Sequence, residues 1–182
     1  RFPDPQVKSY REFYDNTLRL LRSKDLDSFD LNKESSPMRE KYGMGKFGQG
    51  CLLARRLVET GVRYVEVSTD GWDMHNNLES EMQDLSPAFD QAYAALISDL
   101  DDRGMLDDTL VVMATEFGRK PQFNGNGRGH YPICYSTVLA GGGLKRGFVH
   151  GSSDKEGAYP EDPVTVHDLH ATIGWAAGLP MD

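Results

Sequence analysis

The sequence is short of three features that would place it in common functional classes. Only two cysteines, Cys51 and Cys134, occur among its 182 residues, which excludes a disulfide framework, and neither has a partner at metal-binding spacing. No window approaches the roughly 18 consecutive apolar residues of a membrane span, and the first residues lack the order of a signal peptide. We therefore expect a soluble protein in which both cysteines are small buried apolar residues.

Basic residues are also fewer than acidic ones. The 20 Lys and Arg residues stand against 28 Asp and Glu residues, which gives a formal net charge of −8. Such a balance argues against a general nucleic-acid binder and against adsorption to anionic membranes. We therefore predict no nucleic-acid partner and no membrane span.

The chain is long enough to bury a core of its own, and its pattern changes near residue 43. Residues 1–42 are charged and rich in turn formers, with one possible helix over residues 10–22, and predict a peripheral helical arm. Residues 43–182 predict an α/β domain, which opens with a helix of about sixteen residues capped by Gly61.

Helical and strand patterns alternate through this second part. Residues 62–69 predict a buried strand, and Ser86 with Pro87 predicts the start of a helix that Gly104 closes. The run 110–114 is continuously apolar, as in a parallel strand covered on both faces. A third apolar run ends in AGGG, and Thr165 with Asp168 predicts the capped start of a last helix. The order predicts an α/β fold with a mainly parallel sheet flanked by helices.

Polar clusters follow the predicted strands. They are Asp70, Asp73 and His75, then Glu116 and Arg119, then His130 before the third strand. Ligands gather at the carboxyl ends of strands in open α/β sheets, so these residues are expected at one edge. Carboxylates with imidazoles suit a borderline divalent metal, and the planar guanidinium of Arg119 matches phosphate or sulfate.

Each feature also has a simpler interpretation. An Asp-x-His motif in a loop is more often a turn residue beside a surface histidine. Trp72 can simply pack on the sheet, and Glu116 with Arg119 can form a local ion pair. Gly125, Gly127 and Gly129 predict a flexible loop rather than a phosphate loop, because no Lys-Ser/Thr ending or helix follows them.

Three runs of sequence resemble the C-terminal part of the DUF1501 family over about residues 41–180. They are FGQGCLLARRLVETGVRYVEVSTDGWDMH, LDDTLVVMATEFGRKP, and RGHYP followed by VLAGGGLKRGFVHGSSDKEGAYPEDPVTVHDLHATI. The resemblance implies secreted proteins related to the alkaline phosphatase and sulfatase superfamily. It implies an alkaline phosphatase-like fold, present here as a partial, C-terminal copy, and a periplasmic or extracellular location directed by a signal outside this chain.

The resemblance also implies roles for individual residues. Asp73 and His75 match a metal-ligand segment, with Asp70 as a further candidate ligand, and His130 resembles a late metal-binding histidine. Glu116 and Phe117 stand where the superfamily has Asp-His; glutamate can ligate or orient, whereas phenylalanine cannot, which leaves a second metal site in doubt. No segment resembles the superfamily's nucleophile region, and no Cys-x-Pro-x-Arg sulfatase signature is present.

Together these features predict a metal-dependent hydrolase domain acting on a small-molecule or polysaccharide phosphate or sulfate ester. Asp73, His75 and His130 would hold a divalent metal, with zinc first and manganese, iron or calcium as alternatives, while Glu116 and Arg119 take the catalytic roles. The alternative is a non-catalytic binding or scaffold domain that retains the superfamily fold. Transfer or isomerisation of phosphate is a third and weaker hypothesis.

Overall fold

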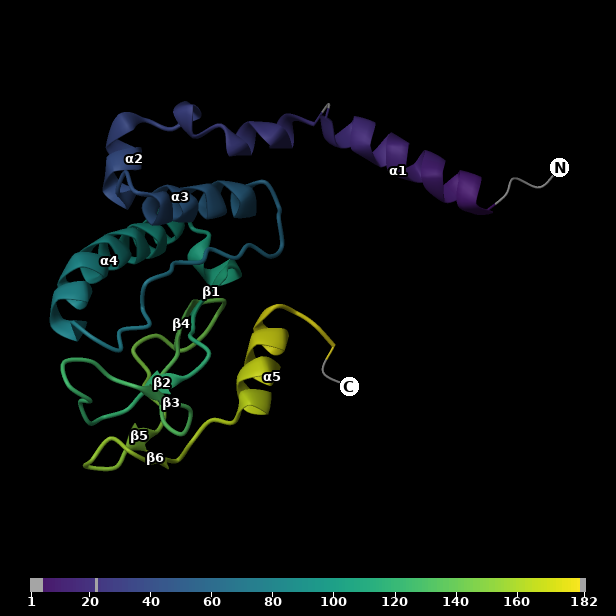
Figure 1. Ribbon diagram of the computed structural model, residues 1–182. Coiled ribbons are helices and arrows are strands. Elements are labelled where there is room, and N and C mark those ends of the chain that lie inside the picture. The colour runs from purple at the N-terminus through teal and green to yellow at the C-terminus, as the bar shows by residue number, and fades with distance from the viewer. Residues whose placement is uncertain (1–4, 22, 181–182) are drawn as a thin grey trace.

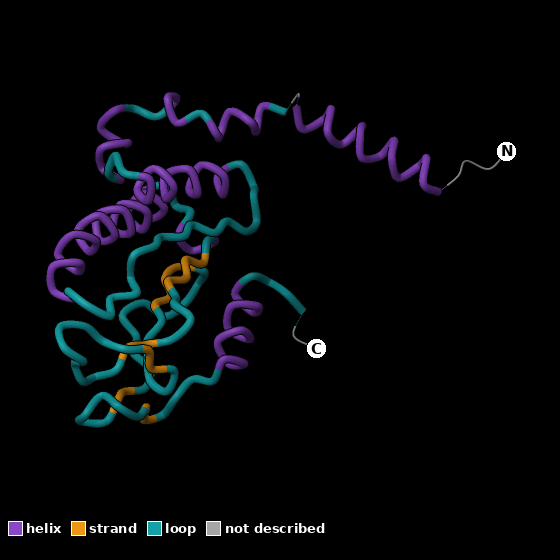
Figure 2. The backbone as a smooth tube through the Cα atoms, viewed as in Figure 1, coloured by secondary structure: helices purple, strands orange, loops and turns teal. Residues whose placement is uncertain are grey.

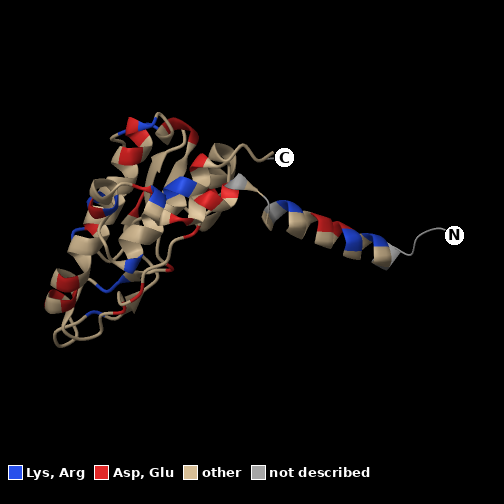
Figure 3. Ribbon diagram, turned by 90° about the horizontal axis from the view of Figure 1, so that it is seen from above, with Lys and Arg blue, Asp and Glu red and all other residues tan. Residues whose placement is uncertain are grey.

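The computed structural model describes residues 5–21 and 23–180, and about 48% of the structure is helical. Helix α1 (Pro5–Leu21) extends away from the rest of the molecule (Figure 1) and carries both charge signs along its length (Figure 3). The short 3-10 helices η1 (Lys24–Phe29) and η2 (Leu31–Lys33) lead to three helices that we call the helical layer: α2 (Ser36–Tyr42), α3 (Lys46–Glu59) and α4 (Leu78–Asp102). The strand region, residues 103–180, follows it.

The hydrophobic core lies in the helical layer. It consists of buried Tyr42, Cys51, Leu52, Ala92 and Ala95, which α2, α3 and α4 contribute. The end of α2 approaches α3 so closely that a Cβ atom at Gly48 would clash with the Tyr42 carbonyl oxygen. Burial raises the pKa of the Cys51 thiol to about 11. Cys51 is thus buried, as predicted, whereas Cys134 is only partly buried, and both are free.

A buried charge network crosses the same layer. Arg55 on α3 is 1% exposed, and its Nε atom lies 2.8 Å from Oδ2 of Asp99 on α4. The Tyr42 hydroxyl donates to the same carboxylate over 2.9 Å, and Arg103 donates to its other oxygen over 2.8 Å. Burial acts to raise the pKa of Asp99, but the bonds from Arg103 and Tyr42 and the charge of Arg55 lower it overall. These contacts tie the three helices together.

The strands pair only in short antiparallel ladders (Figure 2). Strand β1 (Leu110–Met113) pairs with β4 (Val138–Gly141), with Leu110 opposite Gly141. Strand β2 (Gly118–Arg119) pairs with β3 (His130–Tyr131), and β5 (Ser152–Ser153) pairs with β6 (Pro160–Glu161). Within the described residues there is no parallel pair, so the prediction of a mainly parallel, alkaline phosphatase-like sheet flanked by helices is wrong.

The predicted first strand shows why that prediction fails. Residues 62–69 belong to no strand; their side chains alternate in exposure, with Val65 and Val67 partly buried and Tyr64 78% exposed. Val67 packs towards the core of the helical layer. A β-branched run favours an extended backbone, but distant contacts decide whether it finds a partner strand. The second predicted strand does form, although Val112 in β1 is 38% exposed, so its two faces are not both covered.

The helix predictions fare better. Helix α3 lies where it was predicted, with Gly61 in the left-handed conformation just beyond it. Helix α5 (Val166–Ala176) begins with the predicted capping box of Thr165 and Asp168. Helix α4 instead begins at Leu78, so the predicted start at Ser86 is wrong. Pro87 lies inside it, where one backbone hydrogen bond is lost.

The division into an arm at residues 1–42 and a domain at 43–182 stays a prediction. Helix α1 is the part that projects, whereas α2 ends in the fully buried Tyr42. None of the described helices is long and apolar enough to cross a membrane.

Candidate metal centre

The segment between residues 70 and 76 turns two polar side chains outward. Met74 is 2% exposed, and the indole of Trp72 packs edge-on against Phe89 of α4 at 5.6 Å between ring centroids. The Met74 and His75 amides donate to the Trp72 and Asp73 carbonyl oxygens, each over 3.0 Å. With the Trp72 ring packed on α4 and Met74 buried, the Asp73 and His75 side chains are left exposed.

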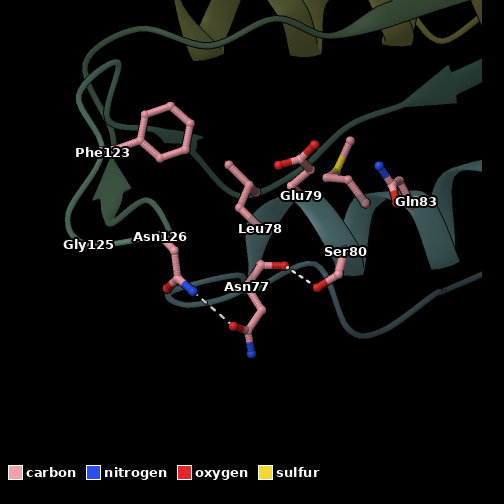
Figure 4. Close-up of a pocket in the computed structure, with 9 residues that line it drawn as sticks. Asn77, Leu78, Glu79, Ser80, Gln83, Phe123, Gly125 and Asn126 are labelled. Atoms are coloured by element: carbon pink, nitrogen blue, oxygen red, sulfur yellow. Dashed lines mark hydrogen bonds between the residues drawn. The ribbon is translucent and has the colours of Figure 1, made fainter.

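The glycine-rich loop packs directly on this segment. The Arg128 amide donates to the Met74 carbonyl oxygen and the Leu78 amide to that of Asn126, each over 3.0 Å. The Asn126 side chain donates to the Asn77 side-chain oxygen over 2.9 Å (Figure 4). Gly127 is buried, and a Cβ atom there would clash with the His75 backbone. The loop is therefore tied to the segment that carries Asp73 and His75.

The β2–β3 ladder brings two more residues to the same place. Arg119 lies directly opposite His130 in this antiparallel pair, and the Lys120 amide extends the pairing with a 2.9 Å bond to the Gly129 carbonyl oxygen. The Phe117 ring contacts the His130 imidazole at 4.5 Å between centroids. The guanidinium carbon of Arg119 lies 5.7 Å from the centroid of the Phe117 ring.

Three ligand-type atoms converge where these segments meet. Nε2 of His130 lies 2.8 Å from Oδ1 of Asp73, and Nε2 of His75 lies 3.1 Å from the same oxygen. The two histidine Nε2 atoms are 3.1 Å apart. The atoms thus form a nearly equilateral triangle, although His130 is 55 residues or more from the other two along the chain.

Arg119 adds a positive charge to the cluster and forms an ion pair with Asp73. Its Nη1 atom donates to Oδ1 of Asp73 over 2.5 Å. The hydrogen bonds from Arg119 and His130 and the nearby charges lower the pKa of Asp73 to about 2. The Asp73 carboxylate is therefore ionised at neutral pH, which is the form that binds a cation.

The three residues fit a divalent metal. Ligands at 2.0–2.2 Å from a tetrahedral zinc ion are separated from one another by about 3.3–3.6 Å, which is about 0.5 Å wider than the 2.8–3.1 Å edges of this triangle. One carboxylate oxygen with two imidazole nitrogens is a donor set used by zinc, manganese and iron. The Asp73, His75 and His130 side chains are about half exposed or more, so solvent can reach the cluster.

Two predicted site residues lie outside this triangle. Asp70 is exposed and does not belong to the one cluster of potential metal ligands found in the described residues. Glu116 is also exposed, and Arg119 pairs with Asp73 rather than with Glu116, so the predicted local ion pair is not formed. The assignments of Asp73, His75, His130 and Asp70 to a metal, and of Glu116 and Arg119 to catalysis, stay predictions.

A surface hollow of about 780 Å³ shares the loop with this cluster (Figure 4). It lies at the first turns of α4, between Asn77 and Met82 on one side and Phe123 and Asn126 on the other. Asn77 is two residues from His75 in the sequence. The residues that line the hollow thus begin two positions after the candidate ligand His75 in the sequence.

Sequence reasoning missed two residues that shape the cluster. Phe117 was considered only as the loss of a ligand, yet its ring packs on His130. Gly127 was assigned to a flexible loop, yet it permits the close contact with His75. The signal for the second was present, because the Asn-Gly pairs of this loop are typical of tight turns.

The fold and the cluster together define a protein of helices and short antiparallel strand pairs that presents two histidines, an aspartate and an arginine at its surface. The chain belongs to the DUF1501 family, described as a protein of unknown function, whose family model matches residues 1–182. The match extends the resemblance noted for residues 41–180 to the whole chain, including α1. No curated protein and no solved structure matches this chain.

Proposed function

We propose that the protein is a metal-dependent hydrolase of phosphate or sulfate esters, with Asp73, His75 and His130 as ligands of one divalent ion. The observation that carries the proposal is the triangle of Asp73 Oδ1 and the two Nε2 atoms, with edges of 2.8–3.1 Å. Two imidazoles and a carboxylate, brought together from distant segments at this spacing, are arranged as ligands of one ion would be.

The residues around the triangle have distinct roles in this proposal. A bound divalent ion would polarise the ester oxygen and lower the pKa of a water ligand. Asp73 supplies negative charge to the ion, and His75 and His130 supply neutral imidazole nitrogens. Arg119 binds the non-bridging oxygens of the ester through its planar guanidinium. Glu116 stays a candidate for orienting a water or ligand.

The exposure of the cluster bears on the substrate. His75 and His130 are 48% and 47% exposed, so a large ester has access as well as a small one. A small-molecule or polysaccharide ester is therefore proposed as the substrate and zinc as the first metal. A periplasmic or extracellular location is proposed on the family resemblance alone.

Hydrolysis of p-nitrophenyl phosphate and p-nitrophenyl sulfate by the full chain tests this function. We expect EDTA to abolish hydrolysis and zinc to restore it. His75→Ala and His130→Ala should each lower the rate to below about 1% of the original, because each removes one of three ligands. His170→Ala, on the exposed face of α5, is the matched control and should leave the rate unchanged. Full activity in both ligand variants would overturn the proposal.

A non-catalytic metal-binding or scaffold domain is the second candidate. The contact of the Phe117 ring with His130 favours it, because a hydrocarbon ring stands where a further ligand would be needed for a second metal. This candidate predicts zinc binding by the same three residues with no hydrolysis of either ester. Zinc-dependent turnover by the full chain would exclude it.

A further inference from the structure

We propose that Arg119 and the divalent cation compete for Asp73, so that binding of the cation frees Arg119 to hold a tetrahedral oxyanion. The inference rests on the proposed metal site and adds a positive coupling, in which a bound cation raises the affinity for the anion. It also names the ligand class of the freed guanidinium, a phosphate or sulfate group.

Three polar groups crowd one oxygen of Asp73. Oδ1 of Asp73 lies 2.5 Å from Nη1 of Arg119, 2.8 Å from Nε2 of His130 and 3.1 Å from Nε2 of His75. A carboxylate oxygen offers about two lone-pair sites, so three polar groups already share it. A cation held by this oxygen and the two imidazoles would therefore meet Arg119 at the same carboxylate oxygen.

Charge decides which group leaves. The two histidines can bind a cation as neutral imidazoles, whereas the Arg119 guanidinium stays positively charged. A dication and a guanidinium on the same oxygen repel each other at short range. Arg119 is therefore the member of the cluster that a cation displaces.

The structure also indicates where Arg119 stays after it is displaced. The β2–β3 ladder pairs its backbone with that of His130, so release from Asp73 requires movement of the side chain alone. The side chain is 25% exposed, and the Phe117 ring lies 5.7 Å from its guanidinium carbon, offering an aromatic face. Arg119 thus stays beside the cluster, and its planar fork matches two oxygens of a phosphate or sulfate group.

Competition of this kind has a reciprocal consequence. If the cation frees Arg119 for an oxyanion, then the oxyanion must raise the affinity for the cation by the same factor. Cation and anion binding are then coupled through one arginine, and removing that arginine should strengthen cation binding while abolishing the coupling.

Calorimetric titration of zinc into the metal-free full chain tests the competition. Arg119→Gln should bind zinc at least about five-fold more tightly than the unmodified chain, because Asp73 no longer has a competing cation. Lys120→Gln removes the same charge one residue away on an exposed side chain and should change the affinity by less than two-fold. Circular dichroism of each variant checks that the fold is kept.

A second titration tests the coupling with sulfate as the probe, against chloride at equal ionic strength. Sulfate should raise the zinc affinity of the unmodified chain at least about five-fold and leave that of Arg119→Gln unchanged. Should Arg119→Gln fail to fold, Arg119→Lys serves instead. It keeps the charge but not the planar fork, and should retain the zinc affinity and lose most of the sulfate effect.

The outcomes separate the two proposals. Equal or weaker zinc binding by Arg119→Gln, or no effect of sulfate on the unmodified chain, overturns the competition and leaves the metal site standing. Failure of the unmodified chain to bind zinc overturns both.

Discussion

The helical layer and the strand region are stabilised in different ways. In the layer, α2, α3 and α4 bury an apolar cluster and a charge network around Arg55 and Asp99. After residue 102 the only buried residues among those described are Leu106, Gly127 and Gly174. The strands there are two to four residues long, and Trp175 on α5 is 64% exposed. The layer is held by a core, and the strand region by local turns and ladders.

The candidate metal centre lies between these two regions. Asp73 and His75 lie next to Trp72, whose ring packs on α4 of the layer, while Arg119 and His130 come from a two-residue ladder in the strand region. A ligand that binds all four residues would connect the regions and stabilise the second more than the first. The arrangement of the centre thus depends on contacts from both regions.

The largest effect is expected when the charge network of the layer is broken. Asp99→Ala leaves the buried Arg55 without its most deeply buried carboxylate partner and should lower the free energy of unfolding by about 3–5 kcal/mol. Asp101→Ala, two residues along the same helix, removes an exposed carboxylate paired with Arg146 and should cost less than about 1 kcal/mol. Urea unfolding followed by circular dichroism measures both. An equal loss of unfolding free energy in the two variants would mean that the buried ion pair stabilises the fold no more than the exposed one.

A pair of apolar truncations compares the two regions directly. Leu52→Ala opens a cavity at a fully buried site in α3 and should cost about 2–5 kcal/mol. Val138→Ala on β4, where the side chain is 41% exposed, should cost less than about 1 kcal/mol. The fluorescence of Trp72 in a Trp175→Phe background reports the unfolding of the layer. A larger loss from Val138→Ala would show that the strand region holds a core of its own.

The smallest expected effect is a loss of stability in acid. Burial acts to raise the pKa of Glu34, but hydrogen bonds from Arg56 and Arg55 lower it overall, as similar contacts do for Asp99. Carboxylates with a lowered pKa stabilise the fold above their unfolded pKa values, about 3.9 for Asp and 4.3 for Glu. That stability is lost as the pH falls below these values towards the lower folded ones.

Urea unfolding between pH 7 and pH 3 measures this loss. Asp99→Asn should flatten the acid slope, whereas Asp101→Asn should not. An unchanged slope in Asp99→Asn would mean that the network carries none of the acid sensitivity.

Local signals predicted the helices well and the sheet poorly. The capping box at Thr165 and the glycine after α3 act through neighbouring residues, so the sequence alone locates those helix ends. Pairing of β1 with β4 joins residues that are 25 or more positions apart, and no local pattern specifies it. Residues 62–69 have the composition of a strand and yet have no partner strand. Pro87 was predicted at the start of a helix, but it lies inside α4, because packing of α4 on α3 stabilises helix on both sides of the proline.

The candidate site was predicted in part, for a reason that proved wrong. His75, Asp73, His130 and Arg119 were expected together at the edge of a parallel sheet, and they do lie together without that sheet. A packed loop and a two-residue ladder bring them into contact instead. Asp70 and Glu116 were included because they follow predicted strands, and Glu116 also because the superfamily has a ligand at its position, but neither side chain joins the cluster.

Zinc content shows whether Asp73, His75 and His130 bind one ion together. The metal-free full chain is dialysed against a slight excess of zinc, then against buffer, and its metal is measured by elemental analysis beside His75→Ala/His130→Ala and His167→Ala/His170→Ala. We predict about one zinc per chain in the unmodified protein and in the α5 control, and less than about a tenth of that in the first double variant. Equal zinc in all three proteins would show that His75 and His130 are not ligands of the metal.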